Sequence, residues 1–138
     1  MKVLIDTSIF VDCLRSNPIE SSKLFLETIE GTSNGFTSSI VVAELSVGAY
    51  LSPRKNALEN TLKLISTTSI INLDKEIALL GGKIYSDLVK QGKEIELNDC
   101  LIAATALFSG IKEVVTKNVD HFERIKQLKV VTPEDLGF

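Results

Sequence analysis

The chain has 138 residues, of which 44% are hydrophobic and 24% charged, values typical of one globular domain over residues 1–138 and unlike those of a disordered chain. Its 18 acidic and 15 basic residues give a formal charge of -3, which argues against bulk electrostatic binding to nucleic acid and leaves room only for a local basic face. Cys13 and Cys100 are too few for a disulfide scaffold, so we expect reduced core thiols. Because we find neither a signal-peptide pattern nor an apolar run long enough to cross a membrane, we expect a soluble cytoplasmic protein.

Strands and helices are predicted to alternate along the chain. Apolar, β-branched runs predict strands at 2–6, 36–40, 69–73, 113–116 and 129–132. Apolar spacing and capping residues predict helices over 8–15, 18–30, 41–51, 53–65, 75–91, 98–109 and 118–126. This alternation predicts an α/β fold, with a mostly parallel sheet covered by helices on both faces.

Four residues carry particular expectations for the helices. Asn17 should cap the second helix with Pro18 in its first position, and Asp74 should cap the long helix that follows the third strand. Gly81 and Gly82 lie inside that long helix at a cost of about 1 kcal/mol each relative to Ala, which suggests close packing against a neighbour.

Three acidic residues each stand alone in an apolar run. Asp6 is the only charge between Val3 and Val11, Glu44 the only one in 36–53, and Asp99 the only one in 97–111. An isolated carboxylate in apolar surroundings must be protonated, pair with a base or bind a cation, and none of these runs contains a Lys or Arg.

The three acids also share a predicted position in the fold. One ends a strand and two lie near helix starts, so in a parallel sheet they can meet at one rim, where oxygen ligands suit Mg²⁺ or Mn²⁺. For each acid alone, capping, solvation or the helix dipole is the favoured explanation, but the combination favours a metal site. Asn118 or Asp120 could supply a fourth group, with capping of a short helix by Asn118 as the alternative.

These residues, in this order, resemble the PIN-domain nucleases, especially the VapC-type toxins of toxin–antitoxin pairs. The resemblance covers nearly the whole chain and is carried by four segments: VLIDTSIFVD, SSIVVAELSVGA, LNDCLIAATAL and VVTKNVDHF. It implies a three-layer α/β/α sandwich, an acidic metal site and an RNA substrate, cleaved to leave a 5′-phosphate and a 3′-hydroxyl. It also implies a homodimer neutralised by a small antitoxin protein that covers the acidic site.

The resemblance assigns roles to individual residues. Asp6, Glu44 and Asp99 match the family's three main acids. Asn118 stands where the family often has a fourth acid, and His121 where relatives frequently have Asp. Both departures affect the site of a second metal, for which Asp120 is a possible substitute. Ser8 and Thr116 match hydroxyls that support the metal site.

Other side chains are interpreted with less specificity. His121, the sole histidine, is expected to be an ordinary solvated side chain, because it lies on a predicted surface turn. Basic residues that could hold the RNA backbone, or simply be solvated, are Arg15, Lys112, Lys117, Arg124 and Lys126. Apolar residues that could contact a partner, or belong to the core, are Phe25, Ile29, Leu58 and Leu62.

Two rival functions fit parts of the sequence. A phosphorelay receiver domain has a similar length and layout, but its phosphoacceptor would have to be Asp74, and Glu44 and Asp99 would then have no role. A PIN scaffold that has lost catalysis would explain Asn118 but not the presence of all three main acids.

Overall fold

A computed structural model describes all residues 1–138 and contains five strands, seven α-helices and a C-terminal 3₁₀ turn. The strands are β1 (Val3–Ile5), β2 (Gly35–Ser38), β3 (Ser69–Ile71), β4 (Glu113–Val115) and β5 (Lys129–Val131). The helices are α1 (Thr7–Leu14), α2 (Glu20–Ile29), α3 (Ser39–Leu51), α4 (Ala57–Ile65), α5 (Lys75–Lys90), α6 (Leu97–Phe108) and α7 (Val119–Phe122), and the 3₁₀ turn is η1 (Glu134–Leu136).

All five strands are parallel and lie in the order β3-β2-β1-β4-β5. The chain therefore builds outward from β1 to β3 and then crosses back to place β4 on the other side of β1. In such sheets, ligands bind beyond the carboxyl ends of the strands at the point where the strand order reverses. Here that point lies between the ends of β1 and β4, where Asp6 and Thr116 follow the two strands.

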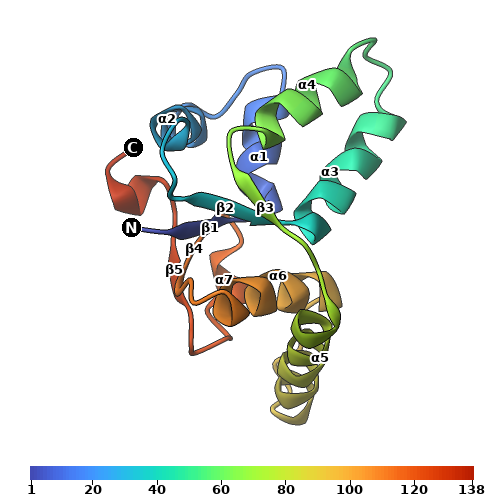
Figure 1. The fold of residues 1–138 in the computed structure, drawn as a ribbon, viewed down its shortest axis with the longest axis vertical. Coiled ribbons are helices and arrows are strands. Elements are labelled where there is room, and N and C mark those ends of the chain that lie inside the picture. The colour runs from blue at the N-terminus through green and yellow to red at the C-terminus, as the bar shows by residue number, and fades with distance from the viewer.

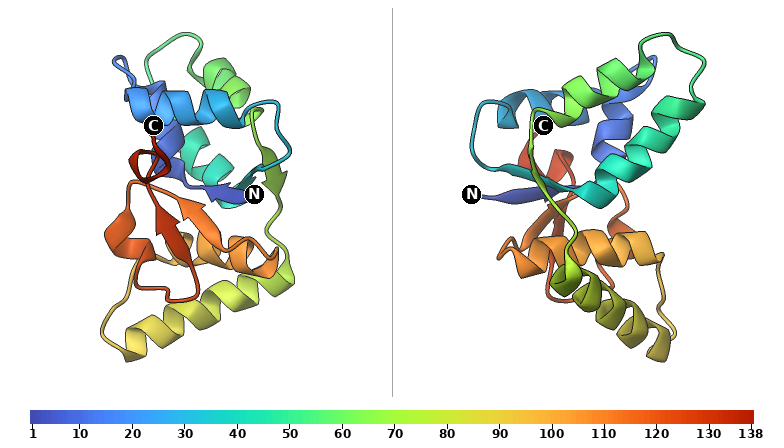
Figure 2. Two further views of the ribbon diagram at one scale, coloured as in Figure 1. Left: turned by 90° about the vertical axis from the view of Figure 1, so that its left-hand side faces the viewer. Right: turned by 45° about the vertical axis from the view of Figure 1, so that its right-hand side comes forward.

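The helices form a layer on each face of the sheet. Figure 1 shows α1, α2, α3 and α4 on one side, and α5, α6 and α7 on the other. Figure 2 shows α5 as the outermost element of its layer and the C-terminus close to α2. The three-layer α/β/α sandwich is thus confirmed, and its sheet is wholly parallel.

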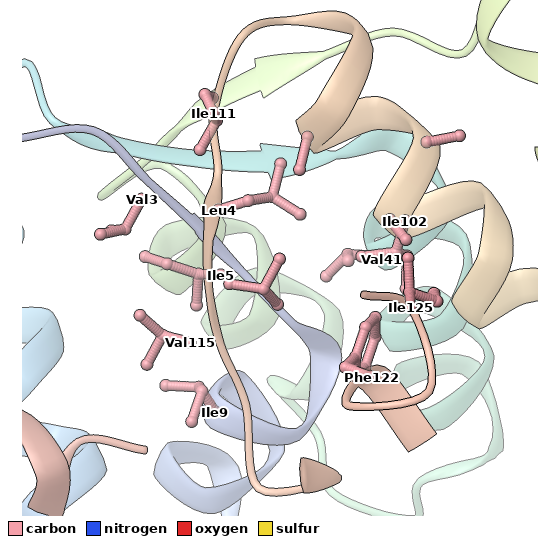
Figure 3. Packing of buried hydrophobic residues seen from close by; sticks show 14 of the residues in the cluster. Val3, Leu4, Ile5, Ile9, Val41, Ile102, Ile111, Val115, Phe122 and Ile125 are labelled. Carbon is pink, nitrogen blue, oxygen red and sulfur yellow. The ribbon is translucent and has the colours of Figure 1, made fainter. Parts of the chain in front are cut away.

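The core occupies both faces of β1. Val3 and Ile5 point toward the α1 layer, whereas Leu4 points toward α6, as the alternation of a strand requires (Figure 3). All three side chains are buried, and burying each contributes about 1.5–3 kcal/mol. A strand buried on both faces explains the unbroken apolar run before Asp6.

Two helices begin later than the capping residues predicted. The helix expected after Asn17 and Pro18 starts at Glu20, because the backbone N–H of Ile19 donates to the carbonyl of Asp12 and keeps the chain extended against α1. The helix expected from Pro53 starts at Ala57, after a turn in which Ser52 Oγ accepts the N–H of Arg54. The prediction for Asp74 is confirmed, since its Oδ1 accepts the N–H of Ile77 at 2.9 Å.

The cysteines and the apolar candidates are also placed. Both cysteines are free thiols, and burial raises the pKa of Cys13 and of Cys100 to about 11. Phe25 belongs to the core, whereas Leu62 is exposed on α4. None of the helices has the length and apolar character needed to cross a membrane.

The two glycines of α5 differ in what surrounds them. A Cβ at Gly81 would lie 2.5 Å from Leu101 Cδ2 and 3.3 Å from Leu101 Cα, so α5 and α6 pack closely at this point. A Cβ at Gly82 would meet nothing within 4 Å, so close packing explains only the first of the pair.

We therefore expect opposite effects from the same substitution at neighbouring positions. Gly81→Ala should destabilise the fold by about 1–3 kcal/mol, because the helices must move apart. Gly82→Ala should stabilise it by up to about 1 kcal/mol through helix propensity. Urea unfolding of both variants measures the difference, and equal effects at the two positions would contradict the packing explanation.

Candidate active site

Asp6 lies at the carboxyl end of the central strand and is 1% exposed. Its backbone N–H donates to the carbonyl of Val115 at 3.0 Å, which continues the β1–β4 pairing past the strand. Although Asp6 occupies the N-cap position of α1, its side chain makes no capping bond. Its Oδ2 instead accepts hydrogen bonds from Ser8 Oγ at 2.8 Å and Thr116 Oγ1 at 2.7 Å.

Ser8 and Thr116 are in turn fixed by the backbone that follows β4. The N–H of Lys117 donates to Ser8 Oγ, and the N–H of Asn118 donates to Thr116 Oγ1, both at 2.9 Å. The two hydroxyl oxygens lie 3.3 Å apart. Each hydroxyl thus accepts from the backbone and donates to the carboxylate, which holds Asp6 in one orientation.

Glu44 reaches the same rim from α3 and is half-buried. Thr7 Oγ1 donates to Glu44 Oε1 at 2.6 Å and links it to the start of α1. The beginning of α3 is fixed by Ser38, whose Oγ accepts the N–H of Ile40 at 3.1 Å. Thr7 was not among the predicted site residues, and its place next to Asp6 is the one feature of the sequence that could have indicated it.

Asp99 comes from the first turn of α6 and is 7% exposed. Its Oδ2 lies 2.9 Å from His121 Nδ1 on α7. Burial raises the pKa of Asp99 above its ordinary value, the hydrogen bond from His121 opposes this rise, and the charges of Asp6 and Glu44 reinforce it. The expectation that His121 is an ordinary solvated side chain is wrong in this respect, because the half-exposed ring contacts a buried acid from a distant part of the sequence.

The three acids therefore lie close enough to repel one another, and they share a pattern of contacts. A protein donor engages Oδ2 of Asp6, Oε1 of Glu44 and Oδ2 of Asp99, and the second oxygen of each carboxylate has no hydrogen-bond donor. No three His, Cys, Asp or Glu side chains stand in an arrangement that would already hold a metal ion. The free oxygens and the accumulated negative charge nevertheless fit a hard divalent cation, which prefers carboxylate ligands.

Asn118 and Asp120 occupy different surroundings. Asn118 is exposed at the N-cap position of α7 and its side chain makes no capping bond, while its N–H binds Thr116. Asp120 is exposed in a hollow that it shares with Lys93 and Arg124, and it is not among the charges that shift the pKa of Asp99.

The two basic residues nearest the rim also differ. Arg15 is exposed and lines a hollow of about 500 Å³ between α1, α3 and α4, into which Glu44 also faces. Lys117 is not a free cation, because its Nζ lies 2.9 and 2.8 Å from the two carboxylate oxygens of Glu134. Arg124 binds the carbonyl of Glu94 at 3.0 Å, and Lys112 and Lys126 are exposed.

Asp74 is excluded as the phosphoacceptor of a receiver domain by its position. It caps α5 after β3, which is an edge strand, whereas the acid at the end of the central strand is Asp6. A receiver domain would also leave Glu44 on α3 and Asp99 on α6 without a role.

Known proteins share both the sequence and the fold. The PIN domain family model matches residues 3–128. Ribonuclease VapC2 of Haemophilus influenzae is 34% identical over 133 residues, which cover 94% of this chain and 96% of that protein. The tRNA(fMet)-specific endonuclease VapC of Salmonella typhimurium is 30% identical over 132 residues, covering 94% and 96%.

Solved structures agree with these sequence relatives. The structure of DNA-bound VapBC from Salmonella typhimurium matches with a TM-score of 0.84 and 28% identity, covering 96% of this chain and 98% of that chain. FitAcB from Neisseria gonorrhoeae matches with a TM-score of 0.81 and 27% identity over the same shares. With a family model spanning nearly the whole chain and a relative at 34% identity, this chain belongs to the PIN-domain family.

Proposed function

We propose that this protein is an endoribonuclease that hydrolyses RNA phosphodiesters with a divalent cation, Mg²⁺ or Mn²⁺, held by Asp6, Glu44 and Asp99. The observation that carries the proposal is the shared pattern of the three acids. Each carboxylate is oriented through one oxygen and offers the other, and none is neutralised by Lys or Arg. The names of the relatives, ribonuclease and endonuclease, support the same reaction class.

The residues around the acids would act by orientation. A bound divalent cation lowers the pKa of a water nucleophile and neutralises charge that develops on the phosphoryl group. Ser8 and Thr116 would fix Asp6, Thr7 would fix Glu44, and His121 would fix Asp99, as partners of metal ligands do elsewhere. Hydrolysis would leave a 5′-phosphate and a 3′-hydroxyl.

Exposed residues near the three acids are the candidates for a fourth metal ligand and for a contact with the RNA backbone. Asn118 is the better-placed fourth group, acting through a water, because its backbone already binds Thr116, whereas Asp120 shares its hollow with basic side chains. Arg15 would contact the RNA backbone beside Glu44, since it is exposed and shares a hollow with that acid. Phosphate contacts of this kind give affinity without sequence choice.

We also propose that the protein is a toxin with a small antitoxin partner, acting in the cytoplasm as a homodimer. The structures that resemble it are VapBC and FitAB complexes, which supports this assignment. The chain offers exposed apolar side chains for such contacts on α3, at Val47, Tyr50 and Leu51. Exposed apolar patches of this kind mark protein contact surfaces.

We expect RNA cleavage to require the cation and each main acid. Asp6→Asn and Asp99→Asn should each lower kcat by more than the roughly 10- to 100-fold that follows loss of a supporting residue, and a chelator should abolish cleavage. Asp87→Asn is a matched control, because the side chain of Asp87 is half-exposed on α5 and forms its ion pair with Lys83 at 2.9 Å. Cleavage by Asp99→Asn at the rate of the control would overturn the assignment of Asp99.

We expect the cation to stabilise the fold independently of RNA. Because only the folded chain brings the three acids together, Mn²⁺ at about 100 times its Kd should stabilise the wild type by about 2.7 kcal/mol. Asp6→Asn should lose most of this gain, and Asp87→Asn should keep it. Thermal melts with and without Mn²⁺ measure the effect, and equal shifts in all three proteins would place the ion elsewhere.

We expect Asp99→Asn to be more stable than the wild type at pH 7 without divalent ions. A folded-state pKa above the unfolded value means that Asp99 contributes stability below its ordinary pKa of 3.8 and loses it as the pH rises through the raised folded value. The neutral amide has no such loss. Melting temperatures from pH 3 to 8 should therefore converge at low pH, whereas a less stable variant at pH 7 would show that the His121 bond outweighs burial.

A further inference from the structure

Lys117 contacts α1 at two levels. Ser8 and Asp12 lie four residues apart on α1 and so share one face of the helix. The backbone N–H of Lys117 donates to Ser8 Oγ at 2.9 Å, and its Nζ lies 4.0 Å from Asp12 Oδ2. Lys117, two residues after β4, thus contacts α1 through its backbone near the start of the helix and through its side chain one turn further on.

The inner partner of Lys117 is rigidly held. Asp12 is buried, and its Oδ2 accepts a hydrogen bond from the buried Ser22 of α2 at 2.7 Å. The backbone carbonyl of Asp12 also binds the N–H of Ile19 before α2. A buried carboxylate is stable only when it is paired, so Asp12 has a fixed position and requires the nearby cation.

The outer partner comes from the C-terminal turn. Both oxygens of Glu134 in η1 bind Lys117 Nζ, and this contact lowers the pKa of Glu134. The side chains of Lys117 and Glu134 are 27% and 53% exposed, so the pair is only partly screened by solvent. The C-terminal Phe138 packs edge-to-face on Phe25 of α2, with ring centroids 5.7 Å apart, which holds this end of the chain in place.

We propose that Lys117 is a positioning residue, and that the ion-pair clamp of Asp12, Lys117 and Glu134 sets the rotation of α1 and thereby places Ser8 on Asp6. The clamp rests on the proposed function of the same site, because Ser8 Oγ donates to Asp6 Oδ2 at 2.8 Å. Lys117 therefore serves the reaction without touching RNA. Its ammonium group pairs with Asp12 and Glu134, and its backbone N–H binds Ser8, which in turn binds the proposed metal ligand Asp6.

The test compares Lys117→Met and Lys117→Arg with Lys83→Met. Lys83 is the matched control, because it forms a 2.9 Å ion pair with Asp87 one turn further along α5. Three quantities are measured: the Kd for Mn²⁺, the hydrogen exchange rate of the Lys117 amide, and kcat and KM for RNA cleavage. The first two need no RNA, so they remain informative even if the proposed ribonuclease activity fails.

The clamp predicts a specific pattern. Lys117→Met should raise the Kd for Mn²⁺ and lower kcat by about tenfold each, speed exchange of its own amide, and leave KM within about twofold. Lys117→Arg should restore most of the Mn²⁺ affinity, of kcat and of the protection of the amide, and Lys83→Met should match the wild type in all three. If Lys117→Met does not fold at the assay temperature, Glu134→Gln tests the same three quantities and should change them about threefold, because only the outer pair is weakened.

Two results would overturn the clamp. An unchanged Mn²⁺ Kd and amide exchange rate, with a raised KM, would make Lys117 a direct RNA contact. Changes of the same size in Lys83→Met would make the effect a general loss of ion pairing.

Discussion

The structure depends on how three buried or half-buried carboxylates are held without a Lys or Arg partner. Each is fixed by a hydroxyl or an imidazole, through one oxygen only: Thr7 for Glu44, Thr116 for Asp6 and His121 for Asp99. A guanidinium would orient a carboxylate equally well, but it would bind both oxygens and cancel the charge. The hydroxyl and imidazole donors each engage one oxygen and leave the second oxygen of the carboxylate free. The pKa of Asp99 is raised mainly by burial and further by the charges of Asp6 and Glu44, so a charged carboxylate at this position costs stability.

The parallel sheet explains why residues so far apart in sequence meet. The strand order reverses at β1, so the chain leaves β1 and β4 toward different sides of the sheet. Asp6 and Thr116, the residues that follow these two strands, therefore meet at the edge between them. Asp6 and Thr116 are 110 residues apart and bonded at 2.7 Å. The elements that carry the other two acids lie in opposite helix layers (Figure 1), α3 on one face and α6 on the other. The rim is therefore assembled from both layers, and it exists only when the whole sandwich is folded.

The sequence predicts the elements well and singles out the three acids as candidates, because both depend on apolar patterning. A lone charge in an apolar run is visible without coordinates, and so is the β-branched run before Asp6. Contacts between distant, ordinary-looking residues are not visible in this way. The sequence indicates a surface position for His121 because it lies on a predicted turn, and only the packing of α7 against α6 brings it to Asp99. Lys117 reads as a free cation for RNA because its partners, Asp12 and Glu134, lie 105 residues before and 17 residues after it.

On the proposed function, the charge of the site also sets an order of binding. Three carboxylates at one rim repel a phosphate, and the nearest lysine is already paired with Glu134, so it cannot offset them. Arg15 is exposed beside Glu44, but one cation cannot balance three anions. RNA can therefore enter only after a divalent ion has neutralised most of that charge, which makes the cation a condition for substrate binding as well as for chemistry. The same repulsion prevents the ion-free protein from binding RNA that it could not cleave. This follows because no Lys or Arg is paired with the three carboxylates.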